Sequence, residues 1–340
     1  AALTPEQLHA VSAALGRVLL HEQAGSEWAI VQGVHQRGYA IRRIGTLHWV
    51  SPEGALRSHL HGGARLDLRQ LFASLCERLN VSELVVAISR NMRAECFQNV
   101  LTCHELGLKV TPMALLYEQL LGRVPVEHVG DNWSLVLPIT SVESFTVTMM
   151  TKRLLDVLVA VLGLAVFCVL LPFVALAIRL DSRGPIFYRQ VRVGRGGRTF
   201  RLLKLRSMFT DAENDGVARW ANKNDSRITR VGRFLRRARL DEMPQFYNVL
   251  VGEMSLIGPR PERPEFVDEL ALQIPFYRAR LAVRPGLTGW AQTRYSYGSS
   301  TEDSLVKLQY DLYYIKHLSL YLDLLICLRT VGVVLSLKGR

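Results

Sequence analysis

The sequence predicts an α/β domain followed by a mostly helical domain, which a re-entrant, proline-broken helix and interfacial amphipathic helices attach to a membrane. Three observations support this prediction: alternating strand-like and helix-like patterns in the first part, a long uncharged run near the middle, and a change of charge between the two parts. Residues 1–150 carry 12 Lys/Arg and 13 Asp/Glu, whereas residues 151–340 carry 30 and 17. We expect an accessory domain over 1–130, a linker over 131–150 and a membrane-associated domain over 151–340.

The first domain has the pattern of an open α/β sheet. Apolar runs at Trp28–Val34, Leu84–Ile88 and Leu108–Met113 predict strands, and helical apolar spacing occurs in Leu68–Leu79 and Met92–Leu106. The expected fold is a small Rossmann-like domain. Because no G-x-G-x-x-G follows a predicted strand, a dinucleotide site has no support, and a regulatory or scaffolding role is favoured.

The composition excludes several classes of protein. The chain is 49% hydrophobic and 21% charged, which excludes a disordered protein. Its five cysteines form no C-x-x-C pair, so we expect buried thiols rather than a zinc site or a disulfide framework. Of the nine histidines only His317 lies in the basic part, and chemistry there is not expected to depend on imidazole. The chain opens at Ala1 without a signal peptide or an initiator Met, which favours an upstream segment.

The uncharged run Val157–Ile178 contains 22 residues. As a helix it would measure about 33 Å, enough for a hydrocarbon core of about 30 Å. Pro172 splits the run because it cannot donate to the carbonyl of Cys168, and neither piece crosses a bilayer alone. Basic residues flank both ends, which favours the cytoplasmic face for both. A re-entrant helical hairpin satisfies both constraints, and the alternatives are a kinked spanning helix and a buried helix of a soluble core.

The charged segments that follow also indicate a membrane surface. Ser182–Ser207 contains eight Lys/Arg and no acid, and residues 228–238 have the spacing of a basic amphipathic helix, which suits an anionic interface or, alternatively, solvent. Leu318–Leu337 carries charge only at Asp323 and Arg329, and we expect it to be interfacial or packed. Nucleic-acid binding is the competing use of the charge, but few aromatic residues accompany it, so no nucleic-acid partner is expected.

One pair of adjacent acids is a candidate for chemistry, because the other two pairs are explained by helix capping or a solvated helix face. Asp241-Glu242 follows the arginine-rich helix and precedes Pro244, where a new helix is expected. An N-cap role for Asp241 is the structural alternative, yet a helix N-terminus beside arginines also suits phosphate. An aspartate needs no base to attack phosphorus when arginines and a divalent cation neutralise the phosphates. These residues therefore fit phosphoryl transfer through an aspartyl intermediate.

Six motifs of the second part occur in the order found in one family. They are Lys152-Arg153 with Asp156, Gly184–Gln190, Lys204–Met208, Leu240–Gln245, Gly258–Pro264 and Arg284–Gln292. In these motifs residues 151–340 resemble the bacterial sugar transferase family, the monotopic polyprenyl-phosphate glycosyl-1-phosphate transferases that start exopolysaccharide and related glycan assembly. Tyr295–Gly298 and Lys307–Tyr314 resemble its exopolysaccharide branch. The first part resembles the Rossmann-like domain that long members carry after four spanning helices.

The resemblance implies a two-step reaction. Asp241 would be the nucleophile that attacks the sugar-bearing phosphate of a UDP-sugar and releases UMP. Polyprenyl phosphate would then take the phospho-sugar from Asp241. Glu242 would complete the acidic pair beside Mg²⁺, which makes both carboxylates the expected metal site. Arg236, five residues before Asp241, matches the phosphate-binding arginine of the family.

Further basic residues of the motifs are weaker candidates. Lys204, Arg206, Arg260 and Arg284 are expected either to hold the diphosphate or acceptor phosphate, or to form ion pairs inside the fold. Trp290 is expected either to stack on uracil or, as the favoured alternative, to be a buried anchor.

Two positions depart from the family pattern. The helix bend, commonly Ser-Pro, is Leu171-Pro172 here, which leaves its detailed turn undefined. Arg239 occupies a position that is often Ser, two residues before the nucleophile, and adds positive charge that bears on donor choice.

The resemblance also implies partners and a location. A UDP-sugar donor, a polyprenyl phosphate acceptor and membrane lipid are expected, at the bacterial inner membrane with the catalytic domain on the cytoplasmic face. No residue decides which sugar is moved, and a homodimer through the accessory domain is left open. Two alternatives remain: a transferase that works by a single displacement, with the acids only holding metal, and a basic membrane-anchored scaffold.

Overall fold

The computed structural model divides the chain into two compact units, Ala1–Val136 and Leu137–Arg340. The residues that it describes are 18–23, 27–33, 41–49, 56–58, 83–86, 94–126, 142–210, 212, 225–295 and 300–335. Each unit is a body of its own, and the second contains every motif of the candidate site.

The first unit contains a six-stranded sheet in the order β4-β3-β2-β1-β5-β6. Its elements are β1 Val18–Gln23, β2 Glu27–Gly33, β3 Ile41–Trp49, β4 Leu56–Ser58, β5 Glu83–Val86, α3 Ala94–Glu105, β6 Lys109–Pro112 and α4 Met113–Leu121. The strands predicted at β2, β5 and β6 and the helix predicted at α3 are confirmed. The helix predicted over Leu68–Leu79 lies outside the described residues.

The sheet is only partly of the predicted parallel kind. β5 and β6 pair in parallel with each other, and β5 with β1, whereas β1, β2, β3 and β4 pair antiparallel. Three residues separate β1 from β2, too few for the crossover that parallel neighbours need. The described strands therefore combine an antiparallel meander with a short parallel β-α-β unit, and the Rossmann-like assignment stays a prediction.

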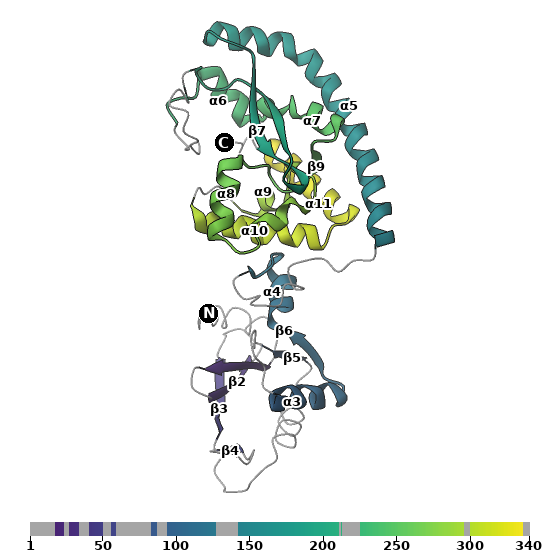
Figure 1. Ribbon diagram of the computed structural model, residues 1–340, viewed down its shortest axis with the longest axis vertical. Coiled ribbons are helices and arrows are strands. Elements are labelled where there is room, and N and C mark those ends of the chain that lie inside the picture. Colours follow the sequence, from purple (N-terminus) through teal and green to yellow (C-terminus); the bar gives the residue numbers. More distant parts are fainter. Residues whose placement is uncertain are drawn as a thin grey trace. The chain divides into compact units, whose positions relative to one another are not determined.

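The second unit begins with the 40-residue helix α5, Val142–Asp181, which curves along one side of the unit (Figure 1). It starts within the stretch 131–150 that the sequence assigned to a linker. The helix continues through Pro172, although this residue removes one backbone donor. Among the described residues, 147–181 form the one helix long and apolar enough to cross a membrane. The re-entrant path of this helix stays a prediction.

The rest of the second unit is mostly helical, as predicted. Its elements are β7 Phe187–Val193, η3 Arg195–Gly197, β8 Thr199–Leu205, α6 Arg230–Arg237, η4 Leu240–Glu242, α7 Gln245–Val251, β9 Ser255–Ile257, α8 Pro264–Gln273, η5 Tyr277–Ala282, β10 Gly286–Thr288, α9 Trp290–Arg294, α10 Thr301–Lys316 and α11 Leu320–Leu335. β7 and β8 form an antiparallel hairpin, and β9 pairs in parallel with β10.

One face of α5 packs on the unit on both sides of the proline. Phe167 and Ile178 share a core cluster with Leu205 and Leu235. The opposite face is apolar and exposed along its length. Its large exposed residues are Leu154, Leu155, Leu158, Val159, Val161, Leu162, Val166, Val169, Phe173, Leu176 and Leu180. An unpartnered apolar face of this size is typical of a surface that meets lipid or another protein.

The part of α5 just before the uncharged run is held by buried polar contacts. Lys152 Nζ pairs with Asp323 Oδ2 of α11 at 2.8 Å. Asp156 Oδ1 accepts from Ser255 Oγ at 3.1 Å and from the Leu256 amide at 3.0 Å. The lysine and aspartate of the first motif therefore anchor the helix to β9 and α11.

The end of α5 is held by the same unit. Asp181 Oδ2 accepts from the Val231 amide at 2.9 Å, at the start of α6. Arg206, at the end of β8, donates to the carbonyls of Ser182 and Arg183. Both ends of the long apolar helix are thus attached to one folded body.

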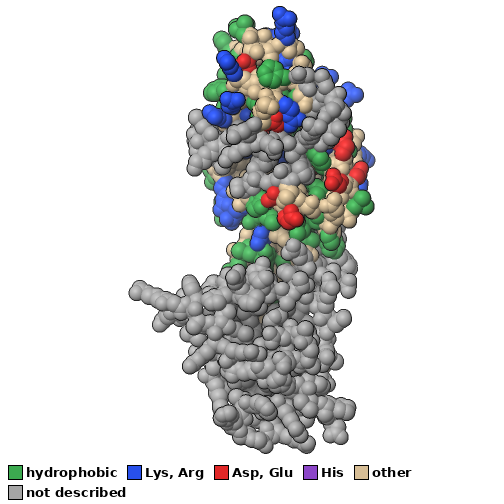
Figure 2. All heavy atoms as spheres, turned by 90° about the vertical axis from the view of Figure 1, so that its left-hand side faces the viewer, with side chains coloured by type: hydrophobic (Ala, Val, Ile, Leu, Met, Phe, Trp, Pro, Cys, Tyr) green, Lys and Arg blue, Asp and Glu red, His purple; other side chains and the backbone are tan. Residues whose placement is uncertain are grey.

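Two further helices present apolar groups to the surface. On α6, Phe234 is 61% exposed and is flanked by the exposed arginines 230, 233 and 237. Exposed Tyr321, Leu324, Leu328 and Val331 follow one face of α11, while its Asp323 is buried, so this helix is packed on one side and apolar on the other. In the view of Figure 2, Lys and Arg side chains lie among hydrophobic side chains on the described part of the second unit.

Candidate active site

A cavity of about 610 Å³ in the second unit is lined by the Asp241-Glu242 pair. Lys204 from β8, Arg236 from α6 and Arg260 from the segment before α8 line the same cavity. Five residues that the sequence singled out, spread over 57 positions of the chain, therefore meet in one cavity.

The turn that presents the two carboxylates is short and sharply bent. α6 ends at Arg237, and Arg239 adopts a left-handed backbone with φ 54°, uncommon for a residue other than glycine. The 3₁₀ turn η4 then buries Asp241 and Glu242. α7 begins at Gln245 and has no side-chain cap. The N-cap alternative for Asp241 is therefore wrong.

The two carboxylates differ in their partners. Glu242 Oε1 accepts a hydrogen bond from Arg260 Nη2 at 2.9 Å and lies 3.6 Å from Lys204 Nζ. Its Oε2 lies 3.3 Å from Arg239 Nη1. In the part of the chain that the structure describes, no hydrogen bond or ion pair reaches the Asp241 carboxylate, although Asp241 is only 7% exposed. One acid is held by cations, and its neighbour on the cavity wall has unengaged oxygens.

These surroundings shift the pKa values of the two acids in opposite directions. Burial alone would raise the pKa of Glu242, but the neighbouring cations, Arg260 first among them, hold that pKa well below its usual range. Burial, and then the charge of Glu242, raise the pKa of Asp241 against the opposing effect of Lys204. Burial lowers the pKa of Lys204 to about 8. The neighbouring cations thus keep Glu242 ionised. Asp241 is less well stabilised as an anion, and additional positive charge beside it would lower its pKa.

Arg236 is oriented by a residue of a different motif. Its Nε donates to Ser207 Oγ at 2.9 Å, and its charge opposes the raised pKa of Asp241. Because Nε is engaged, the two terminal nitrogens are the groups left to meet an anion near Asp241.

Two expected phosphate-binding residues are placed differently. Arg206 Nη1 and Nη2 donate to the carbonyls of Arg183 and Ser182 at 2.5 and 2.6 Å, where the end of α5 leaves carbonyls without helical partners. Arg284 is not among the described residues that line the cavity, and it lies near Arg153, whose charge adds to burial in lowering its pKa. Arg206 thus binds carbonyls just after α5 while it also lines the cavity, and Arg284 is not among the described lining residues; phosphate binding by either residue stays a prediction.

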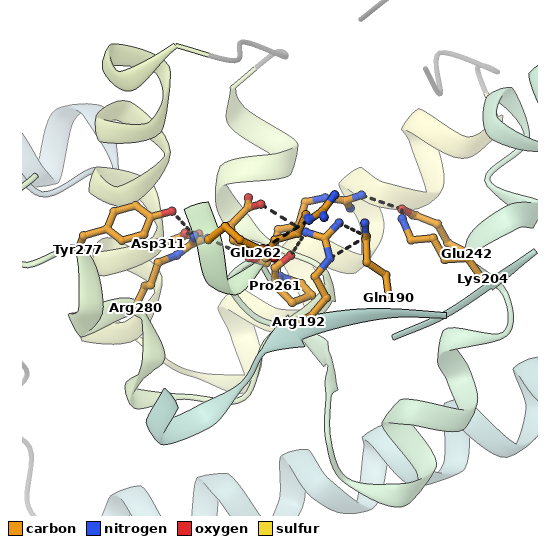
Figure 3. A network of polar contacts seen from close by, with 12 residues as sticks. Gln190, Arg192, Lys204, Glu242, Pro261, Glu262, Tyr277, Arg280 and Asp311 are labelled. Atoms are coloured by element: carbon orange, nitrogen blue, oxygen red, sulfur yellow. Dashed lines mark hydrogen bonds and ion pairs between the residues drawn. The ribbon is translucent and has the colours of Figure 1, made fainter. Parts of the chain in front are cut away.

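A second buried acid lies on the wall of the same cavity. Arg280 Nη2 donates to Asp311 Oδ2 at 2.8 Å, and Arg280 Nη1 donates to the Tyr277 hydroxyl at 2.8 Å (Figure 3). Burial raises the pKa of Tyr277 to about 12. Arg280 Nη2 also donates to the Arg260 carbonyl at 2.9 Å, so this network reaches the residue that holds Glu242.

Comparison with known proteins identifies the family. Residues 147–337 match the bacterial sugar transferase family, over more than half of the chain. This chain belongs to that family.

Several relatives have assigned activities. A UDP-N-acetylgalactosamine-undecaprenyl-phosphate N-acetylgalactosaminephosphotransferase of Aeromonas hydrophila is 44% identical over 234 residues, 69% of this chain and 54% of that protein. A UDP-glucose:undecaprenyl-phosphate glucose-1-phosphate transferase of Caulobacter vibrioides is 48% identical over 187 residues, 54% of this chain and 70% of that protein. An Escherichia coli protein of the same name is 40% identical over 200 residues, 58% of this chain and 42% of that protein. The chain thus spans about half the length of the Aeromonas relative.

The structure adds to the candidate site two contacts that sequence reasoning missed. Ser207 orients Arg236, and Arg239 pairs with Glu242. Ser207 lies inside a motif and Arg239 is a departure from the family pattern. The sequence does not indicate which residue either side chain contacts. Trp290 is 3% exposed and stacks with Tyr313 at 6.0 Å, so it is the buried anchor that was favoured over a uracil platform.

Asp241 and Glu242 are the candidate metal ligands. Among the described residues, no group of three or more His, Cys, Asp or Glu side chains is placed to hold a metal ion. Mg²⁺ needs no such group, because it is commonly bound by one or two carboxylates together with waters and substrate phosphates. The unengaged oxygens of Asp241 beside Glu242 therefore fit a Mg²⁺ ion whose remaining ligands come from a bound phosphate.

Proposed function

We propose that this sugar transferase moves a sugar 1-phosphate from a UDP-sugar to polyprenyl phosphate and releases UMP, with a covalent phospho-sugar on Asp241 between the two steps. The observation that carries the proposal is the Asp241 carboxylate, which no described residue engages and which lines a cavity together with Lys204, Arg236 and Arg260. The names of the relatives support the donor and acceptor classes. We place the reaction at the first membrane step of exopolysaccharide or related glycan assembly.

In the first step an Asp241 oxygen attacks the phosphorus that bears the sugar. A bond forms between this oxygen and phosphorus, the phosphoanhydride bond breaks, and its electron pair leaves with UMP. Lys204, Arg236 and Arg260 offset the repulsion between the carboxylate and the diphosphate. The ionised carboxylate needs no base, and the charges of Lys204, Arg236 and Arg260 favour this form against the burial that raises the pKa of Asp241.

In the second step a phosphate oxygen of polyprenyl phosphate attacks the same phosphorus. The acyl phosphate bond to Asp241 breaks, the carboxylate is regenerated, and the sugar-diphospho-polyprenol remains with the membrane. The same cations serve both steps, because in each displacement negative charge is spread over the oxygens of the same phosphoryl group.

Asp241 and Glu242 are the residues that would hold Mg²⁺. The ion would supply Lewis-acid stabilisation of the phosphate oxygens. Arg260, Lys204 and Arg239 engage Glu242, whereas no described partner engages Asp241, so Asp241 has the more accessible oxygens for such an ion.

We also propose that α5 is re-entrant at the cytoplasmic face of the inner membrane. The residues on either side of its uncharged run are bonded to the same folded unit, through Lys152 and Asp156 before the run and Asp181 after it. A straight span would put those ends on opposite sides of the bilayer. Cysteine labels next to each end should both react from the cytoplasmic side only, and a label that reacts from the outside at either end would exclude this path.

The covalent intermediate can be tested with donor alone. Purified protein with Mg²⁺ and UDP-glucose or UDP-N-acetylgalactosamine should release UMP in one burst, and mass spectrometry should find a hexose or N-acetylhexosamine phosphate on the peptide that contains Asp241. UMP release that requires the acceptor, with no adduct, would indicate a single displacement. No UMP from any UDP-sugar would favour the scaffold.

A further inference from the structure

The segment that carries Arg260 has an unusual backbone. Residues 258–264 read Gly-Pro-Arg-Pro-Glu-Arg-Pro and so contain three prolines. Proline has no amide hydrogen, which leaves the segment few donors for a strand ladder or a helix. Its position must therefore be set mainly through its carbonyl oxygens.

Two arginines hold consecutive carbonyls of this segment. Arg280 Nη2 donates to the Arg260 carbonyl at 2.9 Å, and Arg192 Nη1 donates to the Pro261 carbonyl at 3.0 Å. The side chains come from different elements, Arg280 from η5 and Arg192 from β7. Figure 3 shows Arg192 directed at Pro261 and Glu262, and Arg280 directed at Tyr277 and Asp311.

Each arginine is itself fixed by side chains. Arg280 is 7% exposed and is held by Asp311, which is 2% exposed. Arg192 donates from Nε to Gln190 Oε1 at 3.0 Å and pairs with Glu262 at 3.5 Å. A guanidinium has five donors in a rigid fork, so it can grip a carboxylate and a carbonyl at once, which a lysine ammonium does less well.

We propose that Arg280 and Arg192 are positioning residues for the transfer reaction, which hold Arg260 by its backbone so that its guanidinium meets Glu242 and the donor diphosphate. The inference rests on the proposed function. Neither arginine needs to touch the substrate. Arg280 acts through the Arg260 carbonyl, and Asp311 acts by holding Arg280.

The test uses Arg280→Lys in the full chain. Lysine keeps the buried positive charge beside Asp311 but loses the second arm that reaches the Arg260 carbonyl. We expect kcat/KM for UMP release to fall about 30-fold, because a misplacement of about 1 Å in a catalytic group can cost up to about 10²-fold. Arg192→Lys should lower the rate in the same way, as a second variant from another element.

A double-mutant cycle separates positioning from general loss of structure. In an Arg260→Ala background there is no guanidinium to position, so Arg280→Lys should change kcat/KM by less than about threefold. The matched control is Arg278→Lys, also in η5, whose exposed side chain pairs with Asp268 at the surface. It should behave as the unmodified chain.

The outcomes are distinct. An unmodified chain that releases no UMP contradicts the proposed function itself. An active chain in which Arg280→Lys has the same effect with and without the Arg260 side chain overturns the positioning role, as does an Arg280→Lys variant with unchanged kcat/KM. If Arg280→Lys does not fold, Arg192→Lys in the same cycle decides the question.

Discussion

Two clusters of buried carboxylates and arginines line the same cavity, and they differ in charge balance. At Glu242 the carboxylate meets Arg260, Arg239 and Lys204, and their side chains are 18–33% exposed. At Asp311 one carboxylate meets one arginine, and both side chains are at most 7% exposed.

The difference separates a binding site from a support. Positive charge in excess of negative charge, partly open to solvent, is suited to an anionic ligand that arrives and leaves. A matched pair that is almost fully buried gains little from a ligand, and removing one partner leaves an uncompensated charge. The first cluster should therefore govern activity and the second the geometry and stability of the fold.

The largest effect is expected at the nucleophile. Asp241→Asn should lower UMP release by about 10⁴-fold or more and abolish the phospho-sugar adduct. The midpoint of thermal unfolding should not fall, because no described hydrogen bond is lost and the repulsion by Glu242 disappears. The exposed acid Asp268, changed to Asn, is the control and should keep full activity. UMP release at the unmodified rate from Asp241→Asn would exclude this nucleophile.

The second largest effect is expected from metal removal, which should lower activity and leave stability unchanged. EDTA should reduce UMP release by about 10³-fold, and added Mg²⁺ should restore it, since the ion offsets charge on the phosphates. The unfolding temperature should stay within about 1 °C, because Glu242 is already held by Arg260 and Lys204. A large loss of stability with EDTA would mean that metal supports the fold. This would contradict the assignment of the Glu242 cluster to activity rather than to stability.

At the second cluster the same kind of change should act on stability. Asp311→Asn leaves Arg280 buried without its counter-charge and should destabilise the protein by about 3 kcal/mol. Denaturant unfolding measures this loss. The control is Asp268→Asn, whose partner Arg278 is exposed, and it should cost less than about 0.5 kcal/mol. Equal costs at both positions would show that burial does not distinguish these pairs.

The smallest effect is expected from one cation of the first cluster. Arg239→Asn should raise KM for the UDP-sugar about fivefold, which corresponds to about 1 kcal/mol for a part-exposed charge. Asparagine tolerates the left-handed backbone at this position, so the turn should persist. Arg278→Asn provides the comparison at an exposed site. A change in kcat with KM unaltered would contradict a role in ground-state binding.

Sequence reasoning found the acids and most of the cations but not their arrangement. Asp241, Glu242, Lys204 and Arg260 stand in motifs, and the structure brings all four to one cavity. Arg206 stands in a motif as well, yet its guanidinium donates to the carbonyls of Ser182 and Arg183, just after α5. Residue type and motif cannot tell these roles apart, because an arginine meets a phosphate and a helix carbonyl with the same donors.

The first unit shows the same limit for strands. Apolar runs correctly predicted β2, β5 and β6, because burial in a sheet requires them. Whether neighbours run parallel depends on the chain between them, and the pattern of β1 through β4 was not read as a meander.

The linear order of residues by itself determined the change of charge near residue 150, the apolar helix, and the acidic pair beside arginines, since charge, hydropathy and spacing are local properties of the chain. Only the tertiary structure decided that, within the described part of the chain, Glu242 is held by cations while Asp241 has no partner. It also decided that Arg280, not visible in any pattern, reaches the carbonyl of Arg260. The physical reason is that a hydrogen bond depends on distances of about 3 Å between groups that the chain keeps far apart until it folds.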